Sequence, residues 1–207
     1  MAAATTTTQV FCLAVAEKTD SVVRILASEA DLSSYSFFHR PAIAEFVNFF
    51  TKTVVERTPL GQRAKIEEKE FLGHVFIRPD GLAVVMITIA TYPSRTAFSL
   101  LNRLAEEFSS KFPQKATWAT MNPSTTATRY PELKLHLQKA QDPQSADPFM
   151  RVQKELDETK IVLHKTMESL LARGEKLDDL IVKSDQLSGA SKAFYKTAKK
   201  TNSCCGM

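Results

Sequence analysis

Side chains that could perform catalysis are scattered along this chain of 207 residues. The sequence has no P-loop, no dinucleotide-binding glycines, no nucleophile elbow and no Cys-x-x-Cys pair. It therefore predicts no catalytic residue, and it argues against a small GTPase, which needs a P-loop. The histidines are isolated, and none has a second ligand at the spacing of a metal site. We expect no metal, and surface or packing roles for His39, His74, His136 and His164.

The three cysteines favour modification over disulfide formation. Cys12 lies in an apolar, strand-like run, whereas Cys204 and Cys205 are adjacent and poorly placed to bridge each other. The first residues, MAAATTTTQ, lack the basic and apolar regions of a signal peptide, so we expect a reducing, cytosolic environment. The longest apolar run, Leu82–Ala90, is far shorter than the about twenty residues of a membrane-spanning helix. The terminal cysteines are therefore the candidates for membrane attachment.

The C-terminal residues resemble a lipidation signal. A Cys-a-a-X sequence that ends in Met favours farnesylation, and counting back from Met207 makes Cys204 the acceptor, with Gly206 where an aliphatic residue is preferred. One lipid holds a protein only marginally, so a palmitoyl or second prenyl group, or a basic patch, is also needed. Which cysteine carries which lipid stays open, and no other cofactor is expected. Lysines just upstream supply a basic patch: Lys192, Lys196, Lys199 and Lys200.

The last quarter of the chain carries a heptad pattern. Residues at spacings of three and four form one seam with an average period of 3.5, which is typical of a coiled coil. A continuous helix over residues 149–201 would be roughly 80 Å long. On periodicity alone, a homodimeric coiled coil is the favoured interpretation. The seam consists of Phe149, Val152, Leu156, Thr159, Leu163, Thr166, Leu170, Arg173, Leu177, Leu180, Ser184, Leu187, Ser191, Phe194, Ala198 and Thr201.

Arg173 lies at the centre of this seam and argues against a homodimer. An unpaired buried guanidinium costs several kcal/mol, and two facing copies would repel each other. Its five donors suit several neutral oxygens at once, such as glutamine carbonyls on other helices. Gly174 weakens the isolated helix by about 1 kcal/mol, which suits a segment that folds on binding. The seam therefore predicts a bundle made with different chains.

The preceding part of the chain is predicted to be a separate α+β domain. All prolines lie at or before Pro148. Apolar runs between turn residues predict strands, helical spacing predicts helices, and residues 113–130 are predicted to be loop. The order ββαβββαα favours an antiparallel sheet covered by helices. The strands are Gln9–Ala16, Ser21–Ser28, Ala64–Lys69, Phe71–Ile77 and Leu82–Ala90, and the helices begin near Pro41, Ser94 and Pro131.

The segment Glu155–Leu187 (ELDETKIVLHKTMESLLARGEKLDDLIVKSDQL) resembles the SNARE motif of an R-SNARE, with Arg173 at the central ionic layer. The preceding domain resembles a longin domain, and SSYSFF, YPSR and the CC terminus point to the prenylated longin R-SNAREs, which lack a transmembrane helix. The resemblance implies a profilin-like α+β domain, a five-stranded antiparallel sheet between helices, followed by a long SNARE helix. The expected divisions are a disordered N-terminus 1–8, longin domain 9–140, linker 141–148, SNARE motif 149–201 and lipidated tail 202–207.

The resemblance implies membrane fusion without enzymatic activity. Arg173 would meet one glutamine from each of a Qa, a Qb and a Qc SNARE on the opposing membrane, and the SNARE disassembly machinery would later separate the bundle. A closed form is expected in the cytosol, and the lipidated protein on the cytoplasmic face of Golgi, ER-derived, endosomal and vacuolar membranes. No nucleic-acid partner is expected, because the net charge is only +4. The alternative is a lipid-anchored longin trafficking adaptor with a dimerising coiled coil.

An unpartnered seam and a lipid chain both expose apolar surface, so we expect them to fold back on the longin domain, as the resemblance also implies. Phe46, Phe49 and Phe50 cannot all face the sheet. We expect Phe49, beside Phe46, to dock the tail; burial of Phe49 in the domain core is the open alternative. Ser184 and Ser191 are candidate phosphorylation sites at seam positions, where a phosphate could not be buried. Phosphorylation there is expected to oppose assembly.

Overall fold

The computed structural model describes residues 8–20, 22–68, 71–143 and 160–203. Of the N-terminus predicted to be disordered, only Thr8 is among them. We call residues 8–143 the α/β domain and residues 160–203 the tail. The strands are β1 (Val10–Lys18), β2 (Val23–Ala30), β3 (Arg63–Glu68), β4 (Phe71–Ile77), β5 (Leu82–Ile89) and β6 (Ile161–His164). They form one sheet in the order β2-β1-β5-β4-β3-β6.

The sheet has six strands where five were predicted, and it is mixed. The five strands of the α/β domain pair antiparallel, as predicted. The additional strand is β6 from the tail, which pairs with β3 in parallel. An edge strand leaves a row of backbone groups without partners, and the extended start of the tail satisfies them. The sequence pattern around Ile161–His164 follows the helical seam, so it gave no strand signal.

The turn between β4 and β5 packs against the end of β1. Gly81 in this turn has φ of +88°, and a side chain there would collide with the carbonyl oxygen of Lys18. Lys18 at the end of β1 donates its backbone N–H to the Gly81 carbonyl over 2.8 Å. Glycine is therefore required at this position for two reasons: the left-handed backbone conformation and the close approach of the Lys18 carbonyl.

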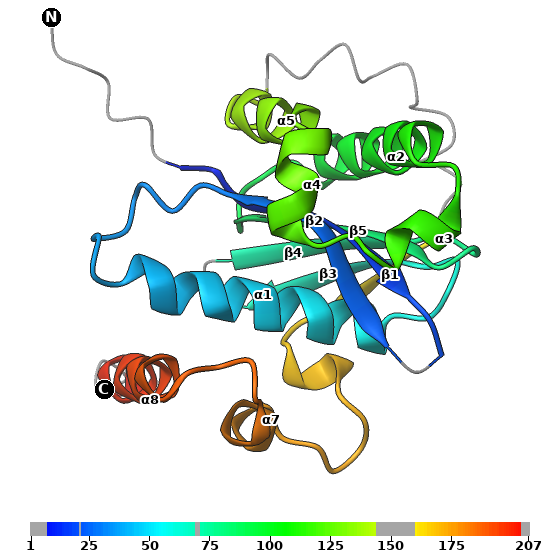
Figure 1. Ribbon diagram of the computed structural model, residues 1–207. Helices are drawn as coiled ribbons and strands as arrows, with labels where there is room; N and C mark the ends of the chain where they lie inside the picture. The colour runs from blue at the N-terminus through cyan, green and yellow to red at the C-terminus, as the bar shows by residue number, and fades with distance from the viewer. Residues whose placement is uncertain (1–7, 21, 69–70, 144–159, 204–207) are drawn as a thin grey trace, which may run out of the picture.

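The central strands are buried on both faces, because alternate side chains point to opposite sides of a sheet. One core includes Leu13 and Val84 and is covered by α2 (Ser94–Lys111) and α5 (Glu132–Ala140). The other includes Ala14 and Val85 and is covered by α1 (Arg40–Arg57). Figure 1 shows α1 on one side of the sheet and α2 and α5 on the other. These three helices correspond to the three that the sequence predicted.

Residues 113–130, predicted to be loop, contain two short helices, α3 (Lys115–Trp118) and α4 (Pro123–Arg129). A capping box starts α4: Asn122 Oδ1 accepts from the backbone N–H of Thr125 over 3.0 Å, and Thr125 Oγ1 accepts from that of Asn122 over 3.2 Å. Pro123 follows at the first helical position, where its missing N–H costs nothing. The signal was present, but threonine replaces the usual glutamate of the box.

The tail is not the continuous helix that was predicted over residues 149–201. After β6 it forms the 3-10 turn η2 (Glu168–Leu170), α7 (Leu177–Lys183) and α8 (Gly189–Ser203). Gly174, at φ of +92°, interrupts any helix between η2 and α7. A long amphipathic helix is stable only when its apolar face is covered. In the single chain the partner helices are absent, so the tail instead follows the surface of the α/β domain (Figure 1).

Candidate functional site

The outer face of α1 holds the tail against the α/β domain. Phe49 is 8% exposed and packs with Ile181 of α7 and with Leu187 in the connection to α8. Phe46 stacks on Tyr195 of α8, with ring centroids 5.6 Å apart and planes inclined by 30°. Phe49 therefore belongs to the interface with the tail and not to either core of the sheet. Figure 1 shows α7 and α8 on the side of α1 away from the sheet, with their axes crossing that of α1.

The first part of the tail joins the core beside α1. Met167 and Leu170 are buried in the same cluster as Val54 of α1 and Ile66 of β3. The backbone N–H of Met167 donates to Glu68 Oε2 over 3.0 Å. Together with the pairing of β6 and β3, these contacts fix the tail at one edge of the sheet.

Polar contacts reinforce the docking of α7 and α8. Glu45 of α1 accepts from the backbone N–H of Ser188 over 2.7 Å, and hydrogen bonds from Ser188 and Ser191 lower the pKa of Glu45. Arg57 at the end of α1 forms an ion pair with Glu175 at 3.0 Å. Since these groups lie at the surface, each contact contributes modestly to stability. Together they join two separate positions of α1 to the tail.

The polar side chains between α7 and α8 also pair with each other. Tyr195 Oη donates to Asp178 Oδ1 over 3.0 Å, and Lys199 forms an ion pair with Asp178. Hydrogen bonds from Lys199 and Tyr195 hold the pKa of Asp178 below its usual value, and burial raises the pKa of Tyr195. The two helices of the tail therefore dock as one unit.

The seam residues fall into three groups in this docked tail. Leu170, Leu187 and Ser191 are buried, and Leu177, Leu180, Ser184 and Phe194 are partly buried. Leu163, Thr166 and Arg173 are exposed, so the central arginine points away from the domain. Ala198 and Thr201 lie in α8. Outside the described residues are Phe149, Val152, Leu156, Thr159, Cys204 and Cys205.

The docking face includes three residues that the heptad pattern does not mark, namely Met167, Ile181 and Tyr195. Ile181 is 3% exposed although it lies next to a seam position. Leu177 and Ile181 are four residues apart and share one face of α7. That spacing could have identified them, but it is hidden by the stronger period of the seam. The tail thus presents overlapping but different faces to a bundle and to the domain.

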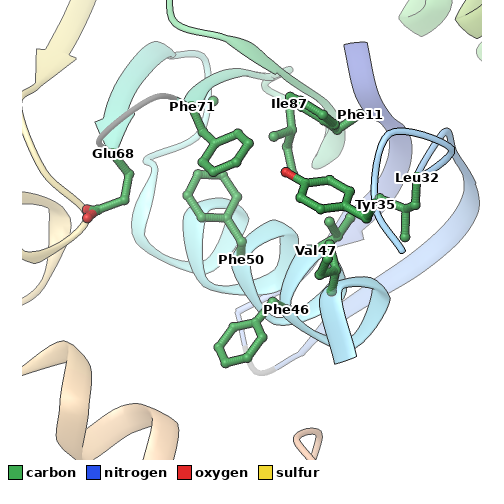
Figure 2. A pocket seen from close by; sticks show the side chains of 11 residues that line it. Phe11, Leu32, Tyr35, Phe46, Val47, Phe50, Glu68, Phe71 and Ile87 are labelled. Carbon is green, nitrogen blue, oxygen red and sulfur yellow. The ribbon is translucent and has the colours of Figure 1, made fainter. Parts of the chain in front are cut away.

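An apolar pocket lies between the inner side of α1 and the sheet. It has a volume of about 150 Å³. In Figure 2 the rings of Tyr35, Phe50 and Phe71 point towards the middle of the pocket, whereas the Phe46 ring and the Glu68 carboxylate are turned away from it. Gly73 makes room for this arrangement, because a Cβ there would lie 2.7 Å from Phe50 Cζ. The lining comprises Phe11, Leu32, Tyr35, Ile43, Phe46, Val47, Phe50, Glu68, Phe71, Gly73 and Ile87.

The pocket continues towards the tail. Phe46, Phe50 and Phe71 also line a second hollow, which the tail closes with Met167 and Tyr195. Neither hollow collects titratable groups in a catalytic arrangement, and the described residues contain no cluster of metal-ligating side chains. No helix among them is long and apolar enough to span a bilayer. The site is therefore an apolar docking surface made of α1, the β3 edge and the pocket.

Two family models match the chain in sequence. Residues 32–131 match the longin, or regulated-SNARE-like, domain, and residues 148–205 match synaptobrevin. The chain is 54% identical to Synaptobrevin homolog ykt6 of Schizosaccharomyces pombe over 183 residues, which are 88% of this chain and 91% of that protein. It is 47% identical to Synaptobrevin homolog YKT6 of Eremothecium gossypii over 197 residues, 95% of this chain and 98% of that one. The chain belongs to the longin R-SNARE family of these synaptobrevin homologues.

Membership of this family gives the chain an R-SNARE role in vesicle fusion, in partnership with other SNARE proteins. Longin R-SNAREs of this kind are not enzymes, in agreement with the sequence analysis. The α/β domain is the longin domain, and the tail belongs to the synaptobrevin region. The contacts described above are thus contacts between a longin domain and the SNARE segment of the same chain.

Proposed function

We propose that this R-SNARE forms a four-helix bundle with one Qa, one Qb and one Qc SNARE, and that Arg173 donates to three partner glutamines at its centre. Five guanidinium donors can satisfy several amide oxygens in a buried layer. The seam residues would then lie on one continuous helix from Phe149 to Thr201. Winding of that helix towards the membrane would draw two bilayers together, and the disassembly machinery would return the chain to its free form.

Part of the seam is buried on the longin domain, and this observation supports a closed form in which the SNARE segment is inhibited. Leu170, Leu187 and Ser191 are buried there, and Leu177 packs beside Phe49. One side chain cannot fill a bundle layer and the groove of α1 at the same time. Bundle formation therefore requires the tail to leave the domain, so the longin domain acts as an inhibitor of its own SNARE segment.

In the closed form, the farnesyl chain on Cys204 would occupy the apolar pocket of Figure 2. What supports this is the lining of the pocket, which is apolar and aromatic apart from Glu68. Phe46 both lines the pocket and stacks on Tyr195 of α8, and α8 ends at Ser203. Release of the tail would expose the farnesyl chain. A palmitoyl or second prenyl group on Cys205 would then hold the protein on Golgi, ER-derived, endosomal or vacuolar membranes.

Phosphorylation of Ser184 or Ser191 would oppose bundle formation, and phosphorylation of Ser191 would also favour release of the tail. Ser191 is 1% exposed, and its Oγ accepts from the Ser188 hydroxyl over 3.1 Å, next to Glu45. A phosphate there would bring close to two negative charges against the Glu45 carboxylate. Ser184 is only partly buried, so phosphorylation there would act mainly on the bundle.

The test of the bundle is charge exchange at Arg173. Arg173→Leu should leave the longin domain folded, since Arg173 is exposed in the closed form, and should impair fusion of reconstituted vesicles. Arg173→Gln should regain fusion when one partner carries the opposite Gln→Arg change, because the layer again has one donor set and three acceptors. Lys176→Gln, at an exposed position outside the seam, is the matched control. Failure of rescue with all three partners would contradict the proposal.

A further inference from the structure

The loop before α1 exposes two adjacent phenylalanines. Phe37 is 76% and Phe38 87% exposed, more than any other large apolar side chain that the structure describes. Their rings meet edge to face, with centroids 6.0 Å apart and planes inclined by 81°. A single exposed apolar residue is ordinary, but a paired aromatic surface on a projecting loop is typical of a binding site.

The loop is braced so that these rings stay outside. Arg40 donates from Nε to the carbonyl of Tyr35 over 3.0 Å and from Nη2 to the carbonyl of Ser33 over 3.1 Å. Tyr35 turns inward, with its ring centroid 5.9 Å from that of Phe11. The inward anchor and the bridging guanidinium fix the backbone between them. The exposure of the two phenylalanines is therefore a property of the folded loop.

The helix beside the pair, α8, is basic and leads in sequence to the residues proposed for membrane attachment. His39 contacts Phe194 of α8, with ring centroids 5.2 Å apart, so the loop and α8 share one end of the molecule (Figure 1). The α8 sequence, GASKAFYKTAKKTNS, contains four lysines and no acidic residue. It ends directly before Cys204 and Cys205. Two carboxylates lie beside α8: Glu45 of α1 accepts from Ser188, and Asp178 of α7 pairs with Lys199.

We infer that Phe37 and Phe38 insert into the interfacial region of an anionic bilayer, so that the closed molecule docks on a membrane through this end. Aromatic rings favour the boundary between headgroups and acyl chains, and lysines beside them are attracted to anionic lipid headgroups. Insertion of the rings and attraction of the lysines would both bring this end of the molecule to the membrane. A protein partner would explain the aromatic pair but not its position beside the basic helix α8. The inference rests on the proposed function only in requiring attachment at the C-terminus.

The test uses the full chain with Phe38→Trp, attached to vesicles through the terminal cysteines. Maleimide-bearing lipid in vesicles of phosphatidylcholine and phosphatidylserine replaces cellular lipidation, so the result does not depend on which lipid the cell adds. Cys12 stays unreacted because it is fully buried, and burial raises the pKa of its thiol to about 12. The native Trp118 is 2% exposed and gives a constant background. Leu135→Trp, at a 53% exposed position on α5 across the sheet, is the matched control.

We expect the emission of the Phe38→Trp variant to shift to shorter wavelength and to be quenched by lipids brominated near the headgroup, and the Leu135→Trp control to change little. Vesicles of phosphatidylcholine alone should give weaker quenching, since the lysines no longer orient the molecule. Equal quenching in the two variants, or none in Phe38→Trp, would overturn the inference. A shift that occurs only after Q-SNARE helices are added would overturn it as well, and would assign the pair to a protein partner.

Discussion

At the scale of single residues, His74 is a buried polar side chain that makes the stability of the core depend on pH. It lies in β4, fully buried, with its Nε2 3.3 Å from Ser94 Oγ and its ring edge to face with Phe98 at 5.4 Å. Burial, with a contribution from the charge of Lys65, lowers the pKa of His74 from 6.5 to about 3. Between these two pH values the imidazole is therefore neutral in the folded domain and protonated in the unfolded chain.

We predict that the longin domain loses stability in acid because of His74. The unfolded chain binds a proton below pH 6.5 and the folded chain only below about pH 3, so stability falls as the pH decreases between these values. At pH 5 the loss is about 2 kcal/mol of unfolding free energy. Urea unfolding at a series of pH values measures it. His74→Gln should flatten the pH dependence in this range, and an unchanged dependence would contradict the assignment.

At the scale of elements, α7 uses different residues for docking on the longin domain and for the bundle seam. Ile181 faces Phe49 in the closed form but is absent from the heptad seam, so its truncation should open the tail without damaging a bundle layer. Ile181→Ala should cost the docked form about 2 kcal/mol or more, a roughly thirtyfold shift towards release. Two measurements detect this shift: the rate of amide hydrogen exchange in α7 and the rate of assembly with Q-SNARE helices. Both rates should increase.

The neighbouring Val182 provides the control for this prediction. It is 57% exposed on the same helix, so Val182→Ala should leave exchange and assembly near the wild-type values. Equal effects of the two substitutions would mean that α7 is held by its backbone and not by the Phe49 contact.

The sequence predicted the elements whose partners lie nearby in the chain and missed those whose partners lie far away. The strands around the Arg78–Gly81 turn, and α1 and α2, were predicted to within a few residues, because turn residues and apolar spacing define them locally. The strand β6 could not be predicted, since Ile161–His164 becomes a strand only against the edge of β3. The seam likewise indicates how the tail packs with partner helices and not how it packs alone. Crowding on α1 predicts Phe49 as a docking residue, whereas the heptad pattern does not mark Ile181 and Met167.

At the scale of the whole molecule, the closed form should be compact and should depend on Phe49. Phe49→Glu places a carboxylate against Ile181 and Leu187, where it would be buried without a partner. Small-angle scattering of the full-length protein should give a larger radius of gyration for this variant than for the wild type. Asn48→Glu, at an exposed position of the same helix, adds the same charge and should stay compact. An extended wild type would disprove the closed form.

Membrane attachment should depend on the terminal cysteines. A Cys204→Ser, Cys205→Ser double variant cannot carry a thioether or thioester lipid, and a basic patch alone binds weakly. On fractionation of cells this variant should stay in the supernatant, whereas the wild type should divide between supernatant and membranes. Intact mass spectrometry of the wild type from its own cells would identify the lipid on each cysteine. A double variant that still sediments with membranes would show that lipidation is not the anchor.

The pairing of β6 with β3 has a consequence for molecules whose tail has entered a bundle. Withdrawal of β6 uncovers the backbone N–H and C=O groups along Arg63–Ile66, and an open strand edge is a template on which a second released molecule can pair. Charges along the strand are a common protection against such aggregation, and this edge carries Arg63, Lys65, Glu67 and Glu68. The SNARE segment therefore also protects its own longin domain from self-association, and the charges of β3 take over that protection during each fusion event.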